Sequence, residues 1–172
     1  MAGPLARALV DDHRRLDALF RAATADPLNV DTAAYDQFRA GLLRHIGLEE
    51  KILLPALQRL RGGTPFPLAA KLRLDHGALA ALLMPTSRAP ILAAIRAILS
   101  AHNELEEGPE GLYATCDQLA ESEVGSLLER LRAAPDVTVT PPSDSAAVMK
   151  TVRGALERAG YRLSDDAAGE GS

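Results

Sequence analysis

Apolar residues recur at helical spacing in four long stretches that glycine and proline separate. The stretches cover about residues 4–23, 31–60, 68–84 and 87–133, the last being interrupted at Gly108-Pro109. Within the second stretch, Pro55 predicts a kink, because proline removes one hydrogen bond from a helix. Four long helices joined by short connections predict an all-α, up-down-up-down four-helix bundle.

The pattern changes after Pro135. Residues 137–140 read as extended chain, and residues 145–160 read as one more short amphipathic helix. We expect this helix to pack on the exterior of the bundle or on a protein partner through Val148 and Val152. The predicted organisation is a bundle over 1–134, a C-terminal extension with a helix over 135–163, and a small, polar, disordered tail over 164–172.

The bundle region repeats itself. The segment that ends in Asp12-His13-Arg14-Arg15-Leu16 matches the one that ends in Asp75-His76-Gly77-Ala78-Leu79. In the same order, His45-x-x-x-Glu49 matches His102-x-x-x-Glu106. Two helical hairpins are therefore interpreted as duplicated halves, and each half supplies an isolated histidine followed by a His-x-x-x-Glu pair.

Composition and charge argue against several classes of protein: nucleic-acid-binding, disulfide-bonded and membrane-spanning proteins. The formal net charge of −4 and the lack of a long basic run argue against a nucleic-acid partner. One cysteine excludes an intrachain disulfide, and no apolar stretch is long enough to cross a bilayer. We therefore expect a soluble, cytoplasmic protein with no membrane partner.

The histidines and two glutamates carry the predicted chemistry. Residues four apart on a helix are neighbours, so His45 with Glu49, and His102 with Glu106, can each converge on one ion. A lone histidine in an apolar stripe is usually a hydrogen-bonded core residue. Here all four histidines of the chain fall on such stripes, and burying them with two carboxylates would be costly without a cation among them. The predicted metal ligands are His13, His45, Glu49, His76, His102 and Glu106.

The order His13, His45-x-x-x-Glu49, His76, His102-x-x-x-Glu106 resembles the pattern of the hemerythrin-like family, whose members carry an HHE cation-binding domain. The resemblance covers about residues 4–133. It implies two iron ions joined by an oxo or hydroxo bridge, with manganese or zinc as the less favoured metals. By similarity, His13 and His45 hold one iron, His76 and His102 hold the other, and Glu49 and Glu106 bridge them.

The sequence departs from the family pattern at one position. Many members carry a fifth histidine four residues after the third, where this chain has Ala80. The missing donor favours binding of an outside ligand at that iron. Tyr113 is predicted as an ordinary core residue, with two alternatives: its hydroxyl hydrogen-bonds a ligand bound at the site, or it replaces the missing histidine.

The resemblance implies a non-haem di-iron protein that binds or reacts with dioxygen, peroxide or nitric oxide. Its roles would be sensing, detoxification or redox chemistry, and an enzymatic role as a peroxide- or nitric-oxide-reactive oxidoreductase stays open. Two alternatives remain: iron storage, delivery or metal-centre repair, and a metal-free helical interaction module.

Overall fold

The computed structural model describes residues 1–164. Throughout these residues the secondary structure is helical and no strand is present, which confirms the predicted all-α class. The chain divides into two compact units, Met1–Ala69 with Asn103–Val139, and Ala70–His102 with Thr140–Ser172. The predicted tail lies almost wholly outside the described residues, and the predicted domain boundary at residue 134 stays a prediction.

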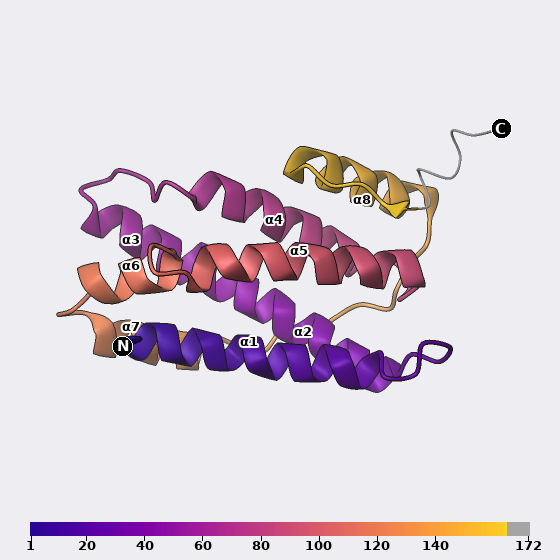
Figure 1. The fold of residues 1–172 in the computed structure, drawn as a ribbon, viewed down its shortest axis with the longest axis horizontal. Coiled ribbons are helices and arrows are strands. Elements are labelled where there is room, and N and C mark those ends of the chain that lie inside the picture. The colour runs from indigo at the N-terminus through magenta and orange to yellow at the C-terminus, as the bar shows by residue number, and fades with distance from the viewer. Residues whose placement is uncertain (165–172) are drawn as a thin grey trace. The chain divides into compact units, whose positions relative to one another are not determined.

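The first unit is built on α1 (Pro4–Ala23) and α2 (Thr32–Leu48), which run side by side in opposite directions (Figure 1). Pro4 occupies the first turn of α1, where a missing N–H costs nothing, and the Asp31 side chain caps α2 by accepting from the amide of Ala34. Leu5, Leu9, Leu16 and Phe20 bury one face of α1. Phe20 meets Phe38 of α2 with ring centroids 4.9 Å apart.

The second predicted helical stretch, residues 31–60, is not a regular α-helix throughout, because a π-helical turn precedes Pro55. A π-helical turn, η1 (Glu49–Leu53), separates α2 from α3 (Leu54–Leu60), and the amide of Leu54 donates to the carbonyl of Glu49. Pro55 has no N–H to give to the carbonyl of Lys51, and the wider turn absorbs that loss. The helix therefore contains a π turn just before Pro55, and this turn begins at the predicted ligand Glu49.

The prediction of one helix over about 110–133 was wrong. The chain forms α6 (Leu112–Leu119) and α7 (Val124–Ala133), separated by a turn in which the amide of Glu123 bonds the carbonyl of Ala120. The turn allows α6 to pack against α1 and α3 while α7 packs against α1 and η1, which one straight helix cannot do. In addition, the carboxylate of Asp117 on α6 accepts the amides of Leu5 and Ala6, both at 3.0 Å, and so caps α1.

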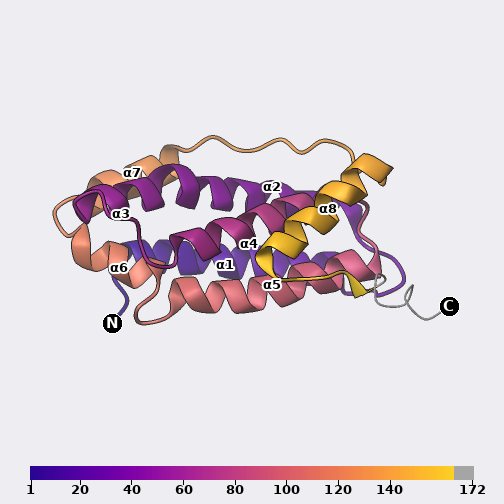
Figure 2. The same cartoon turned by 90° about the horizontal axis from the view of Figure 1, so that it is seen from above.

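The second unit contains α4 (Ala69–Leu82), the first part of α5 (Ala89–Glu107) and α8 (Ala146–Ala159). Ser145 caps α8 at its start, and Gly160, with φ of 88°, ends it in the left-handed region. Within this unit α8 lies beside α4 (Figures 1 and 2), where Nζ of Lys71 bonds the carbonyl of Ala159. The predicted amphipathic helix is thus present. Its buried face is centred on Val152 and includes Met149, while Val148 stays partly exposed.

Candidate metal centre

His45, in the last turn of α2, is oriented by a carboxylate on the neighbouring helix. Its Nδ1 lies 2.7 Å from Oδ2 of Asp12, whose other oxygen accepts from Nε and one terminal nitrogen of Arg15 at 2.9 and 2.8 Å. Partial burial raises the pKa of Asp12, but the hydrogen bonds and charges of His45 and Arg15 outweigh it and lower the value to about 2. An ionised Asp12 only accepts, so Nδ1 of His45 carries the proton and Nε2 faces the interior.

His13, one residue after Asp12 on α1, is held in the same manner. Its Nδ1 lies 2.6 Å from Oε1 of Glu107, and its Nε2 lies 2.9 Å from Nε2 of His45. The side chain of Glu107 is 36% exposed, and it nevertheless fixes the orientation of His13, a predicted ligand. Both imidazoles therefore turn their Nε2 atoms toward one point.

Two carboxylates meet the histidines at that point. Oε1 of Glu49 lies 3.3 Å from Nε2 of His45, and Oε2 of Glu106 lies 3.3 Å from Nε2 of His13. Both glutamates are fully buried, and the four side chains offer ligand atoms that all lie within 4.8 Å of one another. The structure thus brings together His13, His45, Glu49 and Glu106, which the sequence predicted as ligands.

The electrostatics of this cluster favour a cation. Burial lowers the pKa of His45, but Glu49, Asp12 and Glu106 together raise it to about 10. Without a metal the imidazole is consequently held protonated at neutral pH. A divalent or trivalent ion would replace that proton, since imidazole and carboxylate are good ligands for iron, manganese and zinc.

Tyr113 reaches into the same cluster from α6. Its hydroxyl oxygen lies 2.6 Å from Oε1 of Glu49 and 3.1 Å from Oε2 of Glu106. It also lies 2.9 Å from Nε2 of His13 and 3.2 Å from Nε2 of His45. Burial and the two carboxylates raise the pKa of the phenol well above its usual value while no cation is bound. Tyr113 is thus buried, as a core residue would be, and its hydroxyl also contacts the predicted ligands, as in the second sequence-based interpretation.

The turn between α5 and α6 brings Tyr113 there. The predicted interruption at Gly108-Pro109 is confirmed, because α5 ends at Glu107 and α6 begins at Leu112. Gly111 approaches the preceding helix so closely that a Cβ atom would stand 2.5 Å from the carbonyl oxygen of Glu106. Glycine at this position therefore allows the tight turn that aims Tyr113 at the ligand atoms.

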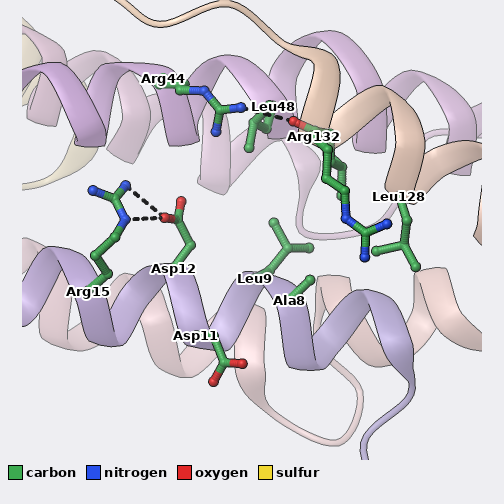
Figure 3. A pocket seen from close by; sticks show the side chains of 10 residues that line it. Ala8, Leu9, Asp11, Asp12, Arg15, Arg44, Leu48, Leu128 and Arg132 are labelled. Carbon is green, nitrogen blue, oxygen red and sulfur yellow. Dashed lines mark hydrogen bonds and ion pairs between the residues drawn. The ribbon is translucent and has the colours of Figure 1, made fainter.

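Two hollows border the cluster within the first unit. A groove of about 410 Å³ between α1, α2 and α7 exposes the outer side of Asp12, with Leu9 and Leu48 in its wall and Arg44 at its edge (Figure 3). A second cavity of about 630 Å³ is lined by Val10, Glu107 and Tyr113, among others. Small molecules can thus approach Tyr113 from the side of α1 and α6.

A sequence model of the hemerythrin HHE cation-binding domain matches residues 5–111, which is more than half of the chain. The chain belongs to this family. No curated protein and no solved structure matches the sequence. Family membership, together with the His/Glu cluster, makes this a helical protein with a metal-cation site. The all-helical architecture of the described residues is consistent with a hemerythrin-like helical bundle.

The hemerythrin-like repeat extends to the groups that orient the ligands. In the second unit Nδ1 of His102 lies 3.3 Å from Oδ2 of Asp75, just as His45 faces Asp12 in the first. The rings of His76 and His102 meet edge-on with centroids 4.8 Å apart, and both are buried. Sequence reasoning noted the repeated Asp-His dipeptide but did not assign its aspartates a role. The repetition of Asp before His in both halves was the sequence feature that could have indicated this role.

The C-terminal segment supports Asp75. Nζ of Lys71 lies 2.6 Å from Oδ1 of Asp75, bonds the carbonyl of Ala159 at 3.2 Å, and stands 4.9 Å from the ring centroid of Tyr161. Burial raises the pKa of Asp75, but His102 and Lys71 lower it overall. A chain of contacts thus runs from the end of α8 through Lys71 and Asp75 to His102.

None of the described helices combines the length and apolar character needed to cross a membrane.

Proposed function

We propose that this protein is a non-haem di-iron protein that binds or reacts with dioxygen, peroxide or nitric oxide. One iron would be held by His13 and His45 and the other by His76 and His102. The family resemblance implies that Glu49 and Glu106 bridge them. Iron in such a centre supplies electron exchange with small oxidants.

The convergence of His13, His45, Glu49 and Glu106 carries this proposal. Neighbouring ligands around a six-coordinate ion with bonds of about 2.1 Å stand about 3.0 Å apart. The distance between the two Nε2 atoms is 2.9 Å, and each Nε2 stands 3.3 Å from its glutamate oxygen. The four atoms therefore already have the spacing of adjacent ligands of one ion.

The surrounding residues prepare the site. Asp12 and Glu107 accept the Nδ1 protons and so keep both Nε2 atoms directed at the cation. Burial excludes bulk water from the glutamates, and the cavity lined by Glu107 and Tyr113 admits small molecules to the edge of the cluster. These features favour a reactive metal site over a storage or delivery site, in which the ion would be loosely held and exchangeable.

Ala80 supports a reactive role over reversible carriage of dioxygen. It lies one turn after His76 on α4, is partly exposed, and its methyl group offers no donor atom. The second iron would consequently keep a position for an outside ligand, which is what a reactive metal centre requires.

Metal analysis of the purified protein, combined with ultraviolet–visible spectroscopy, tests the proposal. We expect two irons per chain and the near-ultraviolet charge-transfer bands of bridged ferric pairs. Adding peroxide should give turnover with the iron retained. Bleaching with release of iron would instead identify a storage or delivery protein. If added iron changed neither the spectrum nor the melting temperature and no iron were bound, the metal-free interaction module would be the remaining alternative.

A further inference from the structure

The hydroxyl of Tyr113 stands among four ligand atoms, and one hydroxyl cannot serve them all. Two are the carboxylate oxygens of Glu49 and Glu106, and two are the Nε2 atoms of His13 and His45. A phenol has a single proton to donate. The phenol can thus donate to only one of the two carboxylate oxygens, while its own oxygen atom stands within 3.2 Å of all four predicted ligand atoms.

The distances agree with a fifth ligand. From the phenol oxygen to the atoms of Glu49, His13, Glu106 and His45 they are 2.6, 2.9, 3.1 and 3.2 Å. Neighbouring ligands of one six-coordinate ion are separated by about 3.0 Å. All four distances lie near that value, as expected if the phenol oxygen and the other four atoms bind one ion together.

We propose that Tyr113 is itself a metal ligand, whose phenolate oxygen binds the ion held by His13 and His45. The inference rests on the proposed function, because it presupposes iron at this site. On binding, the O–H bond of Tyr113 breaks, its proton passes to solvent, and the oxygen lone pair forms the bond to the metal. A bound cation lowers the proton affinity of a coordinating group, so the carboxylates that oppose ionisation in the metal-free protein do not prevent it.

This assignment differs from both sequence-based predictions for Tyr113. The missing histidine at Ala80 concerns the iron of His76, whereas Tyr113 contacts the pair His13 and His45. Tyr113 also lies just beyond residues 5–111, the part matched by the family model. The match to the family model therefore does not bear on this tyrosine.

A phenolate ligand has a redox consequence. Together with the carboxylates of Glu49 and Glu106 it places three negative charges around one ion in a buried site, which favours the ferric over the ferrous state. Phenolate is an established ligand of ferric iron in proteins. The first iron should consequently have a lowered reduction potential, which disfavours the ferrous form that reversible dioxygen binding needs.

The test uses the full-length, iron-loaded protein. We expect a visible charge-transfer band from phenolate to ferric iron, with resonance Raman ring modes that shift when tyrosine is ring-deuterated. Tyr113→Phe should abolish the band, weaken iron binding by about tenfold or more and raise the reduction potential. Tyr35→Phe is the matched control, since Tyr35 is also buried but stacks on Phe38 away from the ligands.

A second variant keeps the test decisive if Tyr113→Phe fails to fold or to hold iron. The chain has three tyrosines, so the double variant Tyr35→Phe with Tyr161→Phe leaves Tyr113 alone. Its band should match that of the unmodified protein. Iron-loaded protein without phenolate modes, or a band that survives in Tyr113→Phe, would overturn the ligand assignment and leave the metal site intact. Absence of bound iron would instead overturn the proposed function.

Discussion

Oδ2 of Asp12 lies 2.7 Å from Nδ1 of His45, so a carboxylate of α1 fixes the tautomer of a histidine of α2. Arg15 holds the other oxygen of Asp12 and prevents the carboxylate from turning away (Figure 3). The duplicated half repeats the relationship between Asp75 and His102. Each Asp-His dipeptide thus contributes one predicted ligand and one group that orients the histidine of the His-x-x-x-Glu pair.

Replacing Asp12 by asparagine tests this relationship. Asp12→Asn removes the charge that favours a protonated Nδ1, so we expect metal affinity to fall by about 10- to 100-fold. The measurement is competition with a chelator of known affinity. Asp11→Asn is the matched control, because Asp11 is the neighbouring residue on α1, is exposed, and pairs with the exposed Arg14 at 3.0 Å. Equal affinities in the two variants would show that Asp12 does not orient His45.

The raised pKa of His45 predicts opposite pH dependences with and without metal. In the metal-free protein the value is about 10, raised from 6.5, so protonation of His45 stabilises the fold below pH 6.5. This stability is lost as pH rises from 6.5 through 10. Metal must displace that proton, so affinity should increase by about tenfold per pH unit over the same range.

Thermal melting of both forms across this range is the measurement. The melting temperature of the metal-free protein should fall as pH rises, and the difference between loaded and metal-free protein should widen. His45→Gln should lack the His45-dependent part of the fall. A metal affinity that does not change with pH would contradict the protonated state of His45.

Gly111 tests how the turn before α6 positions Tyr113. A Cβ atom at this position would stand 2.5 Å from the carbonyl oxygen of Glu106 and 2.7 Å from that of Leu105. Both neighbours are backbone, so Gly111→Ala must move the turn, and we expect a loss of about 1–3 kcal/mol in the free energy of unfolding. Chemical denaturation measures this change.

Gly125→Ala provides the control. Gly125 is exposed in α7, and a Cβ atom there meets nothing within 4 Å. This variant should be stabilised by up to about 1 kcal/mol, because alanine has the higher helix propensity. If Gly111→Ala were equally harmless, the close approach would not determine the position of Tyr113.

Lys71 tests the link between the C-terminal segment and His102. Lys71→Met removes the cation that Asp75 and the carbonyl of Ala159 share, so Asp75 should hold His102 less firmly. We expect the weaker of the two metal-binding steps to lose about tenfold in affinity, measured by titration of the metal-free protein. Lys150→Met, at an exposed position on α8, should leave both steps unchanged.

Asp117 joins α6 to the start of α1, so replacing it tests how much this contact contributes to the stability of the fold. Its carboxylate caps α1 through Leu5 and Ala6, so Asp117→Ala should cost about 1 kcal/mol in the free energy of unfolding. Asp117→Asn should cost less, because its amide oxygen still accepts one bond. Asp117 stands one turn after Tyr113 on α6, and loss of the cap should also weaken metal binding. Unchanged stability in Asp117→Ala would show that water replaces the cap.

The sequence by itself determined the helices and the identity of the buried chemistry. Apolar spacing located α1, α4 and α8 to within a few residues, and the repeated His-x-x-x-Glu pairs indicated His45, Glu49, His102 and Glu106. These features are local, because a helix sets the distance between residues four apart whatever surrounds it. A local disturbance of the helix near Pro55 was predictable for the same reason.

The tertiary structure alone decided which distant residues meet at the site. Asp12 and His45 are separated by 33 residues, and Tyr113 and His13 by 100. Nothing in the spacing of one helix specifies which turn of another it will face. The close approach at Gly111 and the division between α6 and α7 place Tyr113 among the ligand atoms. That outcome depends on packing between helices, since a reset of helical phase at a loop leaves no periodic signal in the sequence.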